Sequence, residues 1–105
     1  MYPPDVPAPL RVFHNRAASR FEVETDGHLS VVTYQLDADA HRVAFDHTGV
    51  PAILEGRGIA AELVAAALAW AEAEGLQVLP RCSYVAAYIR RHPDTRHLLE
   101  PHGAA

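Results

Sequence analysis

The segment Glu55-Gly56-Arg57-Gly58-Ile59-Ala60 places two glycines around an arginine. The glycines let the backbone come close to a ligand because no side chain stands in the way. A helix that begins here offers unpaired N–H groups and the positive end of its dipole, which suit a pyrophosphate. Arg57 adds a full positive charge and a forked set of donors. The segment therefore predicts either an anion-binding turn or a plain strand-to-helix turn that uses its glycines for geometry alone.

Two known phosphate-binding fingerprints are excluded at this turn. The dinucleotide pattern G-x-G-x-x-G needs a third glycine where Ala61 stands. A P-loop needs Gly-Lys-Ser or Gly-Lys-Thr, which the chain lacks.

Cys82 and His47 are candidates for the transfer of a proton or an acyl group. Cys82 comes just before a predicted helix, whose dipole would lower the thiol pKa. It could act as nucleophile, as proton donor or as small core packing. His47 is expected to share one strand face with Val43 and Phe45, where it would be a base, an orienting group or a packed core histidine.

The last predicted helix carries polar groups that could meet a ligand. Tyr84 and Tyr88 lie four residues apart on one face, where they belong either to the core or to a binding site. Arg91 ends this helix, where a cation is favoured by the dipole and could also meet phosphates. The spacing of His92, His97 and His102 does not match a helical metal pair, so we expect no metal site.

The elements that must position these residues follow from the alternation of apolar side chains. Asp26-Gly27 predicts a tight hairpin, and Gly75 predicts the end of the central helix. Ser83 is expected to cap the last helix and Pro93 to stop it. The predicted fold is an α+β (α/β-like) antiparallel meander of three to four strands, a central helix, a parallel fifth strand and a C-terminal helix. The predicted strands are 20–25, 28–36, 42–50 and 76–79, and the predicted helices are 59–74 and 84–91.

Composition limits the possible functions. The chain of 105 residues suits one domain, with residues 11–100 as the folded part, a proline-rich flexible arm at 1–10 and a tail at 101–105. A net charge of -4 provides no basic field for nucleic acid. One cysteine cannot form an internal disulfide and suits a reducing compartment. We see no signal peptide and no apolar stretch that spans a bilayer, so we expect a cytoplasmic protein.

At the glycine turn the sequence resembles the GCN5-related N-acetyltransferases, whose acetyl-CoA loop has the pattern Q/R-x-x-G-x-G/A. Gly58 and Ala60 fill its last two positions, and Glu55 stands where the loop has Gln or Arg. The resemblance is closer to the short YjdJ-type or NATD1-like acetyltransferase domains and covers residues 11–100. Its segments here are 47–51, 56–60, 82–85, 88–89 and 91–93.

The resemblance implies an acetyl-CoA-dependent N-acetyltransferase with a compact fold of this superfamily. Two strands would splay apart to admit the pantetheine arm, with His47 and Cys82 as catalytic residues at the reacting end. Transfer could be direct or pass through an acetyl-cysteine. The implied contacts to acetyl-CoA or coenzyme A are Val50, Ile53, Leu54, Glu55, Gly56, Arg57, Gly58, Ile59, Ala60, Tyr84, Tyr88 and Arg91.

The acceptor would be an amine that the sequence does not identify, and the oligomeric state is equally open. The alternative function is a non-catalytic CoA or acyl-CoA binding or regulatory module, because so short a domain has few loops from which to build an acceptor pocket. A weaker third possibility is a structural domain without a ligand.

Overall fold

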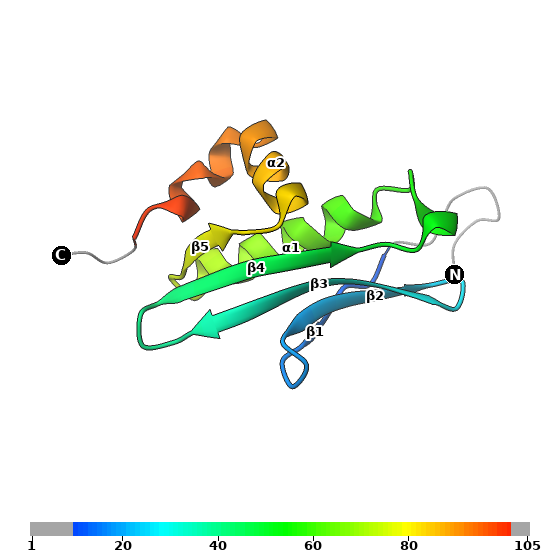
Figure 1. The fold of residues 1–105 in the computed structure, drawn as a ribbon, viewed down its shortest axis with the longest axis horizontal. Helices are drawn as coiled ribbons and strands as arrows, with labels where there is room; N and C mark the ends of the chain where they lie inside the picture. The colour runs from blue at the N-terminus through cyan, green and yellow to red at the C-terminus, as the bar shows by residue number, and fades with distance from the viewer. Residues whose placement is uncertain (1–9, 102–105) are drawn as a thin grey trace.

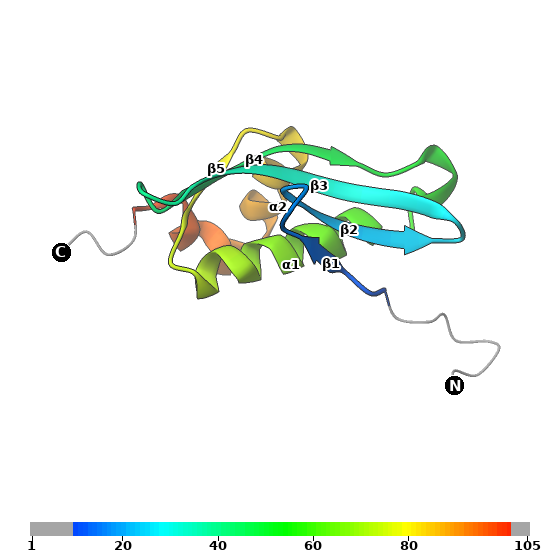
Figure 2. The ribbon, with the colours of Figure 1, turned by 90° about the horizontal axis from the view of Figure 1, so that it is seen from below.

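A computed structural model describes residues 10–101, which form a five-stranded sheet with its helices on one face (Figures 1 and 2). The strands lie side by side in chain order; the first four are antiparallel, and β5 is parallel to β4. This arrangement confirms the predicted fold class. The strands are β1 (Phe13–Asn15), β2 (Arg20–Thr25), β3 (His28–Asp37), β4 (Arg42–Gly49) and β5 (Gln77–Pro80). The helices are α1 (Ile59–Ala73), α2 (Ser83–Arg91) and the short 3-10 helices η1 (Ala52–Leu54) and η2 (Pro93–Leu99).

The hairpin between β2 and β3 turns where the sequence predicts it. Asp26 and Gly27 have φ values of 51° and 77°, which is the left-handed pair that a two-residue turn requires. β1 pairs with β2 at the edge of the sheet and was not predicted, because a strand of three residues is too short to show an alternation.

The two faces of the sheet differ in burial. Phe21 and Val23 of β2 are opposite Val32 and Ser30 of β3, and all four side chains are buried towards α1. Glu22, which lies between Phe21 and Val23, points to the other face. In Figure 2, α1 and α2 lie on the same side of the sheet, so the opposite face is not covered by a helix within residues 10–101.

Helix α1 packs on the inner face through small and branched side chains. Its fully buried residues are Ile59, Leu63, Val64, Ala67, Leu68 and Ala71. The predicted end at Gly75 is confirmed: this residue has φ 66°, its N–H donates to the Glu72 carbonyl at 3.1 Å, and the Leu76 N–H donates to the Ala71 carbonyl at 2.9 Å. Two such bonds around a left-handed glycine satisfy carbonyls that the helix end leaves open.

Strand β4 contains a bulge that changes which side chains face α1. Tyr34 is paired with Phe45, but the preceding Thr33 is paired with His47, so Asp46 is the extra residue. The expectation that His47 shares a face with Phe45 is therefore wrong. His47 lies beside the outward-facing Thr33, and its ring comes within 3.0 Å of the position that a Cβ on Gly49 would take.

The chain after β5 differs from the predictions in two details. Cys82, and not Ser83, is the N-cap residue of α2. Ser83 is already the first helical residue, so its predicted capping role is wrong. α2 ends at Arg91 as predicted, but Pro93 begins η2, where a proline at the first position loses no helical bond.

The predicted arm and tail fall largely outside the described residues. Leu10 is the one residue of the arm that the structure describes, and it packs against the core. In the described residues, no helix is long and apolar enough to cross a membrane. The same residues contain no group of three or more His, Cys, Asp or Glu side chains that could hold a metal ion.

Candidate functional site

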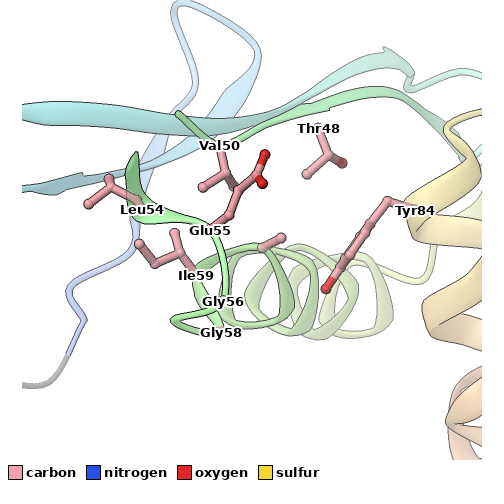
Figure 3. Close-up of a pocket in the computed structure, with 9 residues that line it drawn as sticks. Thr48, Val50, Leu54, Glu55, Gly56, Gly58, Ile59 and Tyr84 are labelled. Carbon is pink, nitrogen blue, oxygen red and sulfur yellow. The ribbon is translucent and has the colours of Figure 1, made fainter. Parts of the chain in front are cut away.

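A cavity of about 430 Å³ opens between the end of β4, the glycine turn and the start of α2 (Figure 3). Eight of its lining residues were predicted as cofactor contacts, and Thr48 was not. The lining consists of Thr48, Val50, Leu54, Glu55, Gly56, Gly58, Ile59, Ala60 and Tyr84. The structure thus brings the predicted glycine turn together with a strand end and a helix start that are distant in sequence.

Apolar side chains form one part of the cavity wall. Leu54 and Ile59 are anchored in the core, with 1% and 2% of their surface exposed. Val50 is half-buried and packs against the same core from the end of β4. Because buried neighbours hold these groups, the cavity offers a preformed apolar surface of the kind that ligand sites use.

The backbone of the glycine turn forms another part of the cavity wall. Gly56 and Gly58 have φ values of 84° and 77°, and no heavy atom lies within 4 Å of the position that a Cβ would take on either. Gly58 is the N-cap of α1, and its carbonyl accepts the first helical bond, from the Glu62 N–H at 3.1 Å. The N–H groups of the first turn have no carbonyl of their own helix to bond, so an anion could take that place.

The side chains of Arg57 and Glu55, the two charged residues of the turn, lie where the sequence did not predict them. The Arg57 guanidinium is bonded to the Asp26 carboxylate across 2.9 Å, and Arg57 is not part of the cavity lining. The Glu55 carboxylate points into the space between α1 and β4 (Figure 3). In this turn, the cation is therefore paired with Asp26, and a carboxylate lies in the cavity wall.

Strand β4 continues beyond the end of β5 beside the cavity. Their parallel pairing covers Arg42 to Phe45, and the last bond between them runs from the Cys82 N–H to the Phe45 carbonyl at 2.9 Å. Beyond this point, within the described residues, no strand pairs with this edge of β4. The expected splaying of two strands is therefore not seen: β5 ends at Pro80, and a gap lies beside the edge of β4 that continues past it.

Cys82 lies at the inner end of this gap. Its Sγ is 3.3 Å from the Thr48 hydroxyl oxygen. Burial raises the pKa of the Cys82 thiol, but the Thr48 hydroxyl and the backbone N–H groups of Val85, Tyr84 and Thr48 together lower it by more. The net pKa therefore lies below the ordinary value, because these donors stabilise the thiolate.

Six predicted site residues lie outside the cavity lining, namely Arg57 and Cys82, described above, and Ile53, Tyr88, Arg91 and His47. Ile53 is 68% exposed on η1, and Arg91 is exposed at the end of α2. Tyr88 stacks on the His92 ring at 3.8 Å between centroids, and it lines a separate cavity beside α1 and η2. His47 points to the outer face of the sheet because of the bulge, so the structure brings Cys82 against Thr48 and not against His47.

Sequence reasoning missed Thr48, which both lines the cavity and contacts the thiol. Strict alternation from Val43 and Phe45 puts Thr48 on the outer face. The extra residue at Asp46 reverses that assignment, and nothing in the strand's composition marks the reversal. The Asp46 carboxylate accepts bonds from Thr33 at 2.5 Å and Gln35 at 3.2 Å, which shows what holds the bulge but only after the pairing is known.

Comparisons with known proteins agree with this geometry. The sequence profile of a family described as GCN5-related N-acetyl-transferase matches residues 20–98. Protein NATD1 of Mus musculus is 34% identical over 91 residues, which is 86% of this chain and 83% of that protein. Protein NATD1 of Homo sapiens is also 34% identical over 91 residues, with 86% and 80% covered. A solution structure of a GCN5-like protein from Staphylococcus aureus has the same fold, with a TM-score of 0.67 at 24% identity over 90% of this chain and 95% of that one.

Proposed function

Because the chain belongs to the GCN5-related N-acetyltransferase family, we propose that it binds acetyl-CoA in the cavity between β4 and α1 and transfers the acetyl group to an amine. The observation that carries this proposal is the cavity itself. It would join an anion cradle at Gly56 and Gly58 to an apolar passage that reaches the gap beside the continuing edge of β4.

The residues present fit the chemical parts of this ligand. The first-turn N–H groups of α1 would hold the diphosphate, which needs donors and no bulky side chains. Val50, Leu54 and Ile59 would cover the pantetheine arm, which is long and mostly apolar. The free edge of β4 beyond Phe45 would offer backbone donors and acceptors to the amides of that arm.

The inner end of the gap would then carry the reaction. In a direct transfer, the amine nitrogen bonds to the thioester carbon and loses a proton, the carbon–sulfur bond breaks, and the departing thiolate takes a proton. The Cys82 thiol, whose pKa is lowered, would supply the proton to the thiolate and regain the one that the amine nitrogen releases, and Thr48 with the nearby N–H groups would stabilise the Cys82 anion in between. Direct transfer predicts no acetyl group on Cys82 in a mass spectrum, whereas transfer through this residue leaves one when no amine is present.

A second function, CoA binding without catalysis, is favoured by one observation. The predicted base, His47, points to the face opposite the cavity. An amine in the gap would therefore have to arrive already deprotonated or use another base. Release of free CoA thiol on addition of candidate amines separates the two functions, since a pure binding module gives no release above the rate without amine.

The glycine cradle provides a test with a matched control. We expect Gly58→Ala to weaken CoA binding at least about tenfold, equivalent to about 1.4 kcal/mol, because the added Cβ extends into the open space in front of the N–H groups. Gly75→Ala introduces a Cβ at a similar φ, also with no atom within 4 Å, at the other end of α1. Its strain should be similar and its CoA affinity unchanged in calorimetry. Equal affinities for both folded variants would remove the cradle from the proposal.

A further inference from the structure

One ion pair joins the glycine turn to a distant part of the chain. Arg57 Nη1 lies 2.9 Å from Asp26 Oδ2, and the two residues are 31 positions apart. Asp26 occupies the tip of the β2–β3 hairpin, so the hairpin and the turn are linked side chain to side chain. Both side chains are exposed, Arg57 by 51% and Asp26 by 68%.

The backbone fixes both ends of this contact. Arg57 lies between two glycines with positive φ, so the backbone on both sides of its side chain has a conformation that favours glycine. Asp26 and Gly27 form the two-residue hairpin turn, which sets the direction of the carboxylate. The same turn lines the cavity through Gly56 and Gly58, so the cation that Asp26 holds belongs to the rim of the cradle.

We propose that Asp26 is an internal counter-ion that competes with a ligand phosphate for Arg57, and is thereby a specificity-determining residue of this site. The inference rests on the proposed function, in that the ligand it concerns is the phosphate-bearing cofactor of the same cavity. Asp26 needs no contact with the ligand, because it acts through the guanidinium that it occupies.

The energetics allow such an exchange. Exposed ion pairs contribute little to stability, because water and salt screen both partners. A phosphate offers the guanidinium two oxygens in a matching fork and more negative charge than one carboxylate. Arg57 should therefore leave Asp26 when a phosphate arrives, and the lost ion pair reduces the net affinity by a modest factor.

The decisive variant is Asp26→Asn, which removes the charge and keeps the turn. Asparagine followed by glycine favours the same hairpin turn, so the backbone at Gly27 should not change. We expect CoA to bind about two- to fivefold more tightly, the range that an exposed pair spans. Pantetheine, which has no phosphate, should bind unchanged. Dephospho-CoA shows which phosphate competes: a similar gain points to the diphosphate and no gain points to the 3′-phosphate.

Two controls separate this mechanism from a general effect of charge. Glu24→Gln removes an exposed carboxylate from the same hairpin, two residues from Asp26, and should leave CoA affinity unchanged. In an Arg57→Ala background, Asp26→Asn should give no gain, because the cation for which the two anions compete is absent. Equal gains from Asp26→Asn and Glu24→Gln, or a gain that persists without Arg57, would overturn the counter-ion role.

Inorganic pyrophosphate distinguishes failure of this inference from failure of the proposed function. Tighter pyrophosphate binding by Asp26→Asn without any CoA binding would remove the proposed function and keep Asp26 as a counter-ion. CoA binding that Asp26→Asn does not change would keep the function and overturn the inference. If Asp26→Asn alters the binding of neither ligand, Asp26 does not compete for Arg57.

Discussion

At the scale of single residues, the acidity of Cys82 comes from the groups around it. Its thiol lies at the N-cap of α2, where Tyr84 and Val85 present backbone N–H groups, and across the gap Thr48 adds a hydroxyl. Burial alone would raise the pKa, so the lowered value depends on the donors outweighing the burial. Thr48 is the one side chain among these donors, which makes it the contact that mutation can remove cleanly.

We expect Thr48→Val to raise the pKa of Cys82 and Thr48→Ser to keep it near the wild-type value. Valine has almost the same shape as threonine and cannot donate, so the thiolate loses a hydrogen bond. The rate of iodoacetamide alkylation followed against pH gives the pKa as its midpoint. The valine variant should therefore show slower alkylation at neutral pH and a midpoint at higher pH. Coincident curves for all three proteins would exclude Thr48 as a source of the acidity.

Residues differ in how much the sequence alone could predict about them. The glycine turn at Gly56 and Gly58 was predictable, since glycines between a strand and a helix mark a turn, but the pattern alone fits a plain turn as well as an anion cradle. The partner of Arg57 was not, because Asp26 is brought near by the length and twist of a hairpin. The place of Thr48 depends on one extra residue in β4, which local alternation cannot show.

At the scale of elements, the small side chains on the inner face of α1 determine how closely this helix packs on the sheet. Ala67 and Ala71 are 1% and 0% exposed where the helix meets the sheet. Side chains of this size let the helix axis approach the strands closely. The alternation in β2 and the 3.6-residue period of α1 were enough to predict both elements, because each has one buried and one exposed face.

A larger side chain should destabilise the protein at a buried alanine of α1 and not at an exposed one. We expect Ala67→Leu to lower the free energy of unfolding by about 1–3 kcal/mol, because the added atoms have no room against the sheet. Ala69→Leu adds the same atoms at an exposed position of α1 and should change that free energy by less than about 0.5 kcal/mol. Urea denaturation of both variants measures the difference. Similar losses of unfolding free energy in both variants would mean that the effect comes from helix propensity and not from packing against the sheet.

At the scale of the whole molecule, an aromatic cluster ties the first strand to the rest. The His14 ring of β1 stacks on Phe21 at 4.0 Å and meets the edge of Trp70 of α1 at 4.8 Å. Its Nε2 lies 2.7 Å from the Tyr34 hydroxyl on β3. Burial lowers the pKa of His14, and the charge of Arg16 lowers it further. Three strands and a helix therefore meet around a side chain that prefers to be neutral.

This cluster predicts a dependence of stability on pH. The folded protein holds His14 with a pKa below the unfolded value of 6.5, so the unfolded chain binds protons more readily. The contribution of His14 to stability is fully present above about pH 6.5 and falls as the pH drops below it. The fluorescence of Trp70, the one tryptophan, reports unfolding within the cluster. His14→Phe should flatten the acid side of the profile, while His28→Gln on the exposed hairpin should not; a profile unchanged by His14→Phe would contradict the assignment.

Strand β4 has two halves with different numbers of neighbouring strands, and this difference bears on how the protein can evolve. Arg42 to Phe45 has a strand on each side, so a change there must satisfy β3 and β5 together. His47 to Gly49 pairs with β3 alone among the described residues, and its other edge borders the cavity. Substitutions that arise in this second half therefore have one neighbouring strand fewer to satisfy. One continuous strand thus combines a segment held on both edges with a segment held on one.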